Sequence, residues 1–155
     1  VFVIAQQESL REYAMLVRLM YASRAVEPIR QEALQAILKT STGWNPKLGI
    51  TGVLCFSGDV FMQVLEGGRM QVSGLYNRIS QDPRHRDVAL LSFDEISERS
   101  FAGWSMGQVN INRLNPALLI KYSETGVLDP YSVPAKASQA LFIELVATAS
   151  VMCLG

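Results

Sequence analysis

The sequence predicts an α+β fold in which two helices cover one face of a single sheet. Several short segments place apolar residues at every second position, which is typical of β-strands. Two longer segments repeat apolar residues at spacings of three and four, which is typical of helices that bury one face. Turn-forming residues separate the segments, most clearly at Ser57-Gly58-Asp59. The resulting order, β-α-β-β-α-β-β, predicts a split, ferredoxin-like arrangement.

The first strand and helix come from the beginning of this pattern. We predict a strand over residues 16 to 23, where Val17, Leu19 and Tyr21 share one face. A helix is predicted over residues 29 to 42, because its apolar residues gather on one side. These residues are Ile29, Ala33, Leu34, Ile37, Leu38 and Ser41.

A hairpin follows the first helix. Two apolar runs, residues 49 to 57 and 60 to 66, flank the turn-forming segment and predict two strands joined by a tight turn. In a ferredoxin-like sheet, we expect the strand over 60 to 66 to lie beside the first strand. We expect these two to form a central, parallel pair.

The second half of the pattern gives one helix and two strands. A helix over residues 69 to 81 ends at Asp82-Pro83, since a proline disfavours helix at the residue before it. We predict strands over residues 88 to 96 and 104 to 109. The helix shows the i, i+3, i+4, i+7 pattern. Its apolar positions are Val72, Leu75, Tyr76 and Ile79.

Segments at both ends lie outside this pattern. Residues 15 to 110 form the predicted domain, and residues 1 to 14 are interpreted as a leader or a vector-derived segment. Residues 111 to 155 are interpreted as a helical cap and interaction segment. A short helix is predicted from Asn115, and an apolar helix from Ser138 to Met152.

The apolar helix offers a cover for the sheet face opposite the first two helices. Met20, Met62 and Val64 point to that face, and so much apolar surface is not expected in water. Two alternatives remain open: the helix caps the sheet alone, or it covers the sheet with one stripe and a second chain with the other. The stripes are Leu141, Leu145 and Thr148, and Phe142, Val146 and Ala149.

Composition limits the classes of function. The chain has 155 residues, 49% of them hydrophobic, and its 14 basic residues balance 14 acidic ones, which argues against a nucleic-acid partner. No apolar run is long enough to span a membrane. Cys55 and Cys153 are far apart in sequence, so we expect free thiols and a reducing, cytoplasmic location. With His85 as the single histidine, a metal site is not expected.

Gln63 is the most informative polar residue. It lies on the predicted strand 60 to 66, where Phe61 and Leu65 share its face. A buried primary amide lowers stability unless its donors and acceptor find partners. A satisfied core amide and a functional amide are both consistent with this position.

Five segments, in order and spacing, resemble the BLUF domain, a flavin-binding sensor of blue light. The resemblance covers roughly residues 15 to 110. The matching segments are Arg18-Leu19-Met20-Tyr21-Ala22-Ser23, Asn45 with Gly49-Ile50-Thr51-Gly52, Phe61-Met62-Gln63-Val64-Leu65-Glu66-Gly67, Asp82-Pro83-Arg84-His85 and Trp104-Ser105-Met106.

The resemblance implies roles for these residues. Tyr21 and Gln63 match the phenol and amide of the family's photoactive relay, in which light rearranges the amide's hydrogen bonds. Trp104 and Met106 share one predicted face, and either can approach Gln63. The flavin implied is FAD, with FMN as the alternative. The implied binding residues are Tyr21, Ile37, Ser41, Trp44, Asn45, Gln63, Arg78, Ile79, Asp82, Arg84 and His85.

Some of these positions carry a specific expectation. Asn45 precedes Pro46, which is expected to hold it extended and aim its amide at the polar edge of the flavin. Ile37 and Ile79 would clamp the two faces of the ring, and Arg78 would bind phosphate. Trp44 departs from the family pattern of Asn or His, and would stack on the ring or restrict access.

The function expected is therefore a blue-light photoreceptor without an attached output enzyme. The tail segment Leu118-Leu119-Ile120-Lys121-Tyr122-Ser123 resembles that of short, oligomeric BLUF proteins, which implies a homo-oligomer and a response-regulator-like partner. One alternative is a small enzyme of acylphosphatase type, although its Arg-Asn pair on a glycine loop is missing. Another alternative is a light-independent interaction module.

Overall fold

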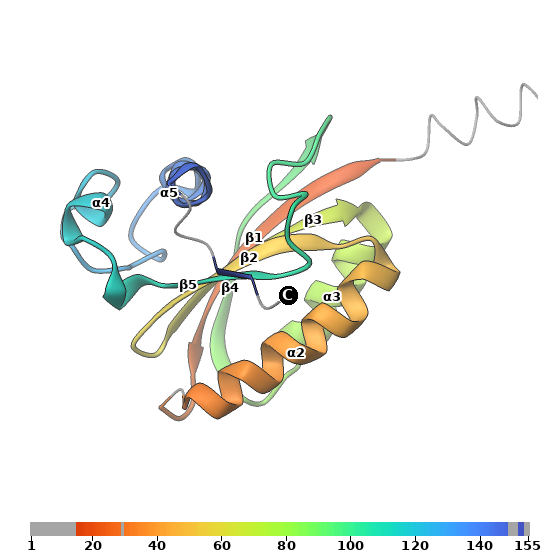
Figure 1. Ribbon diagram of the computed structural model, residues 1–155, viewed down its shortest axis with the longest axis horizontal. Helices are drawn as coiled ribbons and strands as arrows, with labels where there is room; N and C mark the ends of the chain where they lie inside the picture. Colours follow the sequence, from red (N-terminus) through yellow and green to blue (C-terminus); the bar gives the residue numbers. More distant parts are fainter. Residues whose placement is uncertain (1–14, 29, 149–151, 154–155) are drawn as a thin grey trace, which may run out of the picture.

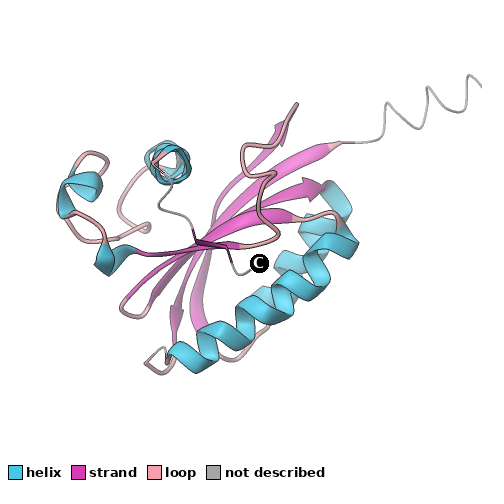
Figure 2. Cartoon of the chain, viewed as in Figure 1, coloured by secondary structure: helices cyan, strands magenta, loops and turns pink. Residues whose placement is uncertain are grey.

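One six-stranded sheet, in the order β4-β1-β3-β2-β5-β6, separates two layers of helices. The computed structural model describes residues 15–28, 30–148 and 152–153. Figure 1 shows α2 and α3 on one side of the sheet and α4 and α5 on the other, and Figure 2 shows the sheet between them. The elements are β1 (Leu16–Ala25), α2 (Gln31–Leu48), β2 (Thr51–Ser57), β3 (Val60–Gly68), α3 (Arg69–Ser80), β4 (His85–Ile96), β5 (Gly107–Asn110), a 3-10 helix (Ile111–Arg113), α4 (Pro116–Ile120), α5 (Ala135–Ala147) and β6 (Met152–Cys153).

The predicted α+β, ferredoxin-like class is confirmed, but the predicted direction of one strand pair is wrong. β1 and β3 are neighbours and run antiparallel, not parallel. The α2 crossover makes β1 and β2 run the same way, and the tight turn after β2 reverses the chain into β3 between them. The parallel pair of the sheet is β2 with β5.

Helix α2 extends beyond its predicted end at residue 42 and includes Asn45 and Pro46. The helix ends instead at Gly49, which adopts the left-handed conformation at φ 68° and whose N–H bonds the Pro46 carbonyl. Glycine takes this conformation without a steric penalty, so it fixes the helix end more strongly than the proline does. The expected extended conformation of Asn45 is therefore wrong.

The last predicted strand of the domain is also shorter than expected. β5 begins at Gly107, and Trp104 lies in the loop that precedes it. This loop, residues 97–106, is called the β4–β5 loop below. Because the alternation of strand residues does not apply inside a loop, Trp104 and Met106 do not share a face.

Two apolar cores lie on the two faces of the sheet. The helix-side core comprises Val17, Leu19, Tyr21, Leu34, Ile50, Leu54, Leu65, Val72 and Met106. The tail-side core comprises Met20, Val53, Cys55, Val60, Met62, Val64, Phe101, Val109, Ile111, Leu119, Leu128, Leu141, Phe142 and Leu145. The predicted cover of the second face by the tail is confirmed.

The tail differs from its prediction in two ways. Helix α5 ends at Ala147, and Met152 pairs with Gln108 in the short strand β6, so the predicted helix to residue 152 is wrong. Leu141 and Leu145 of one stripe and Phe142 of the other are all buried against the sheet within the same chain, so the two stripes do not divide between the sheet and a second chain. The short helix predicted from Asn115 is present as α4, and Asn115 caps it, since its Oδ1 accepts from the Ala117 N–H at 3.0 Å. The leader 1 to 14 and Ala149 lie outside the described residues.

Candidate functional site

Tyr21 and Gln63 face each other on the helix side of the sheet. They are directly opposite in the register of β1 and β3, so their side chains point to the same face. The Tyr21 hydroxyl donates a hydrogen bond to Gln63 Oε1. Both side chains are buried. The phenol and the amide therefore meet as expected, but through an antiparallel pair and not through the predicted parallel one.

Met106 completes a series of three residues. Gln63 Nε2 donates to Met106 Sδ at 3.1 Å, and Met106 belongs to the helix-side core. Trp104 packs instead against the tail-side core, on the other face of the sheet. Of the two residues that could approach Gln63, the structure places Met106 there and Trp104 away from it.

Asn45 approaches the same region from the last turn of α2. Its side chain is buried, and Nδ2 donates to the Ser105 carbonyl at 2.8 Å. Its backbone carbonyl accepts from the Ile50 N–H at 2.9 Å, which helps to end the helix. Two neighbouring residues of the β4–β5 loop, Ser105 and Met106, thus contact the two buried amides of the site. The sequence did not single out Ser105, because it contributes only a backbone oxygen.

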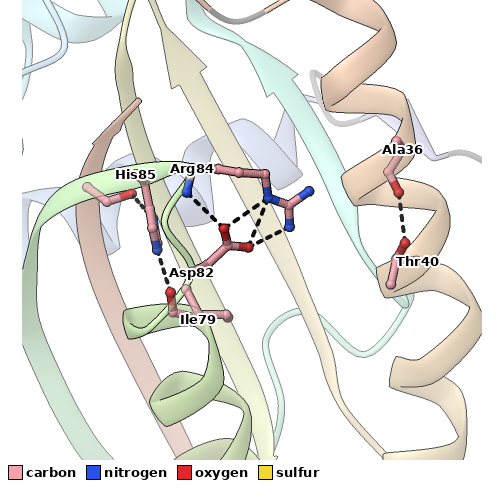
Figure 3. Close-up of polar contacts among 7 residues, drawn as sticks. Ala36, Thr40, Ile79, Asp82, Arg84 and His85 are labelled. Carbon is pink, nitrogen blue, oxygen red and sulfur yellow. Dashed lines mark hydrogen bonds and ion pairs between the residues drawn. The ribbon is translucent and has the colours of Figure 1, made fainter. Parts of the chain in front are cut away.

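His85, Asp82 and Arg84 gather where α3 ends and β4 begins (Figure 3). His85 Nδ1 lies 2.9 Å from Ser23 Oγ on β1, and Nε2 bonds the Ile79 carbonyl of α3. Asp82 accepts the Arg84 backbone N–H at 2.9 Å and its Nε at 2.9 and 3.0 Å. His85 is part of β4, which begins earlier than predicted, and its ring ties α3 to β1.

The remaining predicted binding residues lie on the two helices. Ile37 on α2 and Ile79 on α3 are partly buried, and Ile79 packs against the helix-side core. Arg78 is exposed on α3, and within the described part of the chain its guanidinium has no hydrogen-bond or ion-pair partner. Trp44 is exposed on α2, with Lys47 Nζ 5.3 Å from its ring centre. Ser41 is also on α2, and its side chain lies outside the described part of the structure.

Burial controls the protonation of the phenol. Loss of solvation raises the pKa of Tyr21 well above its usual range, and the nearby Tyr76 and Asp82 add to this. The hydrogen bonds from Arg84 lower the pKa of the Asp82 carboxyl. Near neutral pH the site therefore holds a protonated phenol beside a neutral amide, with an ionised carboxylate at the end of α3.

The hydrogen-bonding capacity of these residues exceeds what their partners use. Gln63 Nε2 carries two N–H groups, and the only acceptor among the described residues is a weak one, Met106 Sδ. Asn45 Oδ1 accepts no hydrogen bond from the described part of the chain. A flavin offers carbonyl acceptors and a ring N–H along one edge of an apolar ring system. The amides, with apolar neighbours such as Leu54 and Ile79, fit such a group.

The described fold is a ferredoxin-like sheet that carries a hydrogen-bonded phenol and amide beneath two helices. Residues 16–107 match the family described as sensors of blue light using FAD. The chain belongs to this family, the BLUF domains.

Three relatives illustrate the similarity. The photoactivated adenylate cyclase subunit beta of Euglena longa is 40% identical over 92 residues, which cover 59% of this chain and 11% of that protein. The dark-state structure of BlrB, a BLUF protein, matches with a TM-score of 0.75 at 31% identity and covers 88% of this chain and 98% of BlrB. BlsA in its photo-activated state matches with a TM-score of 0.76 at 32% identity, covering 85% and 95%. The chain spans about a tenth of the length of the cyclase.

Two further properties concern the described residues as a whole. None of their helices combines the length and the apolar character needed to cross a membrane. Their histidine, cysteine and acidic side chains form no group of three that could hold a metal ion. Cys55 is a buried free thiol, as predicted.

Proposed function

We propose that this chain senses blue light through FAD and signals by rearranging the hydrogen bonds of Gln63. The observation that carries the proposal is the series Tyr21 hydroxyl, Gln63 amide and Met106 sulfur on the helix-covered face of the sheet. When bound, the flavin supplies blue-light absorption and, once excited, the ability to withdraw an electron from a neighbouring donor.

Tyr21, Gln63 and Met106 have different roles in the proposed switch. Tyr21 holds a proton on its hydroxyl in the dark, since burial disfavours the phenolate. Gln63 Oε1 is the acceptor to which that proton moves when the phenol is oxidised, and from which it returns when the phenol is reduced again. While this bond is broken, the amide is free to turn.

A turned amide has a defined consequence at Met106. In the arrangement seen here, Gln63 points its nitrogen at Met106 Sδ and its oxygen at Tyr21. Turning the amide points its oxygen at the sulfur, and two acceptors do not bond each other. The contact with Met106 is then lost, and the change reaches β5, which begins at the next residue.

Binding of the cofactor is assigned to the residues around this series. We propose that Asn45 and Gln63 bond the polar edge of the ring, and that Ile37 and Ile79 flank its faces. Arg78 and Arg84 are proposed to serve the phosphates, because a guanidinium fork suits them. Trp44, Ser41, Asp82 and His85 are proposed to line the same region. No enzymatic step is assigned to these residues.

The output is proposed to pass to another protein chain. We propose a homo-oligomer or a response-regulator-like partner in the cytoplasm, with the tail helices α4 and α5 as the contact region. Support comes from Ile120, Val127 and Ile143, which are apolar and exposed on this part of the molecule.

Absorption spectroscopy on the purified protein tests the function. We expect bound FAD, a shift of the visible flavin bands to longer wavelength under blue light, and a return in darkness. Titration with FMN in parallel should show weaker retention. A protein that binds neither flavin after unfolding and refolding with the cofactor would contradict the proposal.

A further inference from the structure

Two charged side chains lie buried on the tail side of the sheet, away from the phenol and amide. Arg18 and Glu66 are opposite each other in the register of β1 and β3, and Glu66 is 0% exposed. Glu66 Oε2 accepts from Arg18 Nε at 2.8 Å and lies 2.7 Å from Arg18 Nη2. A buried ion pair is weak support for stability, because desolvation opposes the attraction, so its partners suggest another role.

The remaining hydrogen bonds of Glu66 hold the β4–β5 loop. The Ser100 and Phe101 N–H groups donate to Glu66 Oε2 and Oε1 at 3.1 and 2.7 Å. Arg18 Nη2 also donates to Ser100 Oγ at 2.7 Å. A carboxylate that binds two successive backbone N–H groups fixes the path of the loop at that point. This carboxylate belongs to β3 of the sheet.

The same loop contains the residues that contact the two buried amides, Asn45 and Gln63. After Phe101 the chain turns, with the Trp104 N–H bonding the Phe101 carbonyl at 3.3 Å and the Gly52 N–H bonding the Trp104 carbonyl at 3.1 Å. The next two residues are Ser105, which accepts from Asn45, and Met106, which accepts from Gln63. The anchor at Phe101 thus sets where this short segment begins.

We propose that Glu66, held in place by Arg18, is a positioning residue of the light-sensing site: it anchors the β4–β5 loop so that Met106 contacts Gln63. The inference rests on the proposed function for its effect on the light response, and on the hydrogen bonds alone for its effect on Met106. Phe101 extends the anchor to the tail, since its ring packs edge-on against Phe142 of α5 with centres 6.1 Å apart.

Glu66→Gln is the primary variant, because it keeps the shape of the side chain and removes its charge. The amide nitrogen cannot accept a backbone N–H, so one anchor bond is lost. Glu66→Asp keeps the charge, so its effect should be smaller than that of Glu66→Gln. Glu95→Gln is the matched control, since Glu95 is an exposed carboxylate on β4 paired with Arg69.

The first measurement is NMR of methionine methyl groups labelled with ¹³C, with Met106 assigned through Met106→Leu. In Glu66→Gln we expect the Met106 resonance to shift or split, while the resonance of exposed Met70 stays in place. The second measurement is the dark recovery after blue illumination. A looser loop hinders rotation of the Gln63 amide less, so recovery should be about tenfold faster or more, the size expected from losing one bond to a charged group.

The outcomes separate the two proposals. A folded, flavin-bound Glu66→Gln protein with an unchanged Met106 resonance and recovery rate would overturn the positioning role. If the wild-type protein shows no light response, the proposed function fails, and the Met106 resonance still decides the positioning role. If Glu66→Gln does not fold, Arg18→Met with Glu66→Leu replaces it, since apolar residues of similar size preserve packing but leave the Ser100 and Phe101 N–H groups without an acceptor.

Discussion

The function proposed for Tyr21 and Gln63 depends on cross-strand pairing. Neither residue is unusual alone, because a tyrosine and a glutamine on strands are each more often parts of a core. The register of β1 and β3 makes them opposite neighbours, and burial keeps the phenol protonated and the amide largely shielded from solvent. Met106 adds an acceptor so weak that the amide can exchange it for another partner.

Tyr21→Phe tests the phenol of this series. We expect flavin to remain bound and the reversible spectral shift to disappear, since the ring stays in place and only the exchangeable proton is removed. Tyr76→Phe is the matched control, because its ring centre lies 5.7 Å from that of Tyr21. Absorption before and after illumination is the measurement. A normal shift in Tyr21→Phe would assign the switch to another donor.

The stability at high pH tests the burial of the same phenol. The pKa of Tyr21 is raised in the folded state, so the phenol stays neutral there while the unfolded chain ionises above a pH of about 10. The stabilising contribution is therefore complete below that pH and is lost as pH rises above it. We expect the unfolding free energy to fall less steeply in Tyr21→Phe, by up to about 1.4 kcal/mol per pH unit.

Urea unfolding at a series of pH values from about 9 to 11 provides that measurement. Cys55, whose pKa burial also raises, contributes to the slope in both proteins, so the difference between them isolates Tyr21. Equal slopes would show that the phenol ionises as freely in the folded protein as in the unfolded chain.

At the level of single residues, the sequence did not predict every contact of the proposed site. The position of Gln63 on an apolar strand left a core amide and a functional amide both open, and the family pattern supplied the functional interpretation of Gln63, Tyr21 and Asn45. The choice between Trp104 and Met106 could not follow from alternation, because the loop before β5 breaks it. Ser105 and Ser23 lie in the matching segments but received no predicted role, since a backbone oxygen and a small hydroxyl leave no pattern in a sequence.

At the level of elements, α3 carries the exposed Arg78 that we assign to phosphate. Arg78→Ala should weaken flavin binding by about 1.5–3 kcal/mol, which is about 10- to 150-fold in the dissociation constant, and leave the spectral shift of the bound fraction intact. Arg113→Ala is the control, because it removes an exposed arginine of the tail. Isothermal titration with FAD measures both. Equal affinities in the two variants would return Arg78 to an ordinary surface residue.

Helix α5 gives a prediction of stability. Phe142 is 0% exposed and packs against Phe101, so Phe142→Ala should lower the unfolding free energy by about 3–5 kcal/mol. Ile143→Ala, on the exposed side of the same helix, should have a much smaller effect. Chemical denaturation followed by circular dichroism compares them. A small effect of Phe142→Ala would mean that α5 does not close the tail-side core.

The elements also show where sequence patterns lose information. The apolar periods predicted α2, α3 and the two strands of the hairpin. Most ends of these elements were predicted to within a few residues. The end of α2 was missed because Pro46 is tolerated in its last turn and Gly49 sets the stop. Strand β6 was missed because its two residues pair with β5 through backbone groups, for which side chains give no signal.

For the whole molecule, the arrangement of layers connects the sensing site to the tail. The helix-side core holds Met106, the tail-side core holds Phe101, and one loop carries both residues. A change at Gln63 can therefore reach α5 through that loop without passing through the rest of the sheet. The exposed Ile120, Val127 and Ile143 lie on the segment that would receive it.

Hydrogen exchange and light scattering test this connection. We expect backbone amides of α5 and of the β4–β5 loop to exchange at different rates in the dark and under illumination, together with a change in oligomeric state or partner binding. Gln63→Leu is the control, because it removes the amide and should abolish both differences. A monomer with identical exchange in the two states would contradict a route through the tail.

The most direct test of the account is the vibration of the Gln63 amide itself. Light-minus-dark infrared difference spectra would be recorded on flavin-bound protein with ¹⁵N in the glutamine side chains, and on the same protein carrying Gln63→Leu. If Gln63 is the switch, amide bands should appear on illumination, shift with the isotope, decay with the flavin signal in darkness, and be missing in Gln63→Leu. A reversible flavin shift with no isotope-sensitive amide band would contradict a switch based on Gln63.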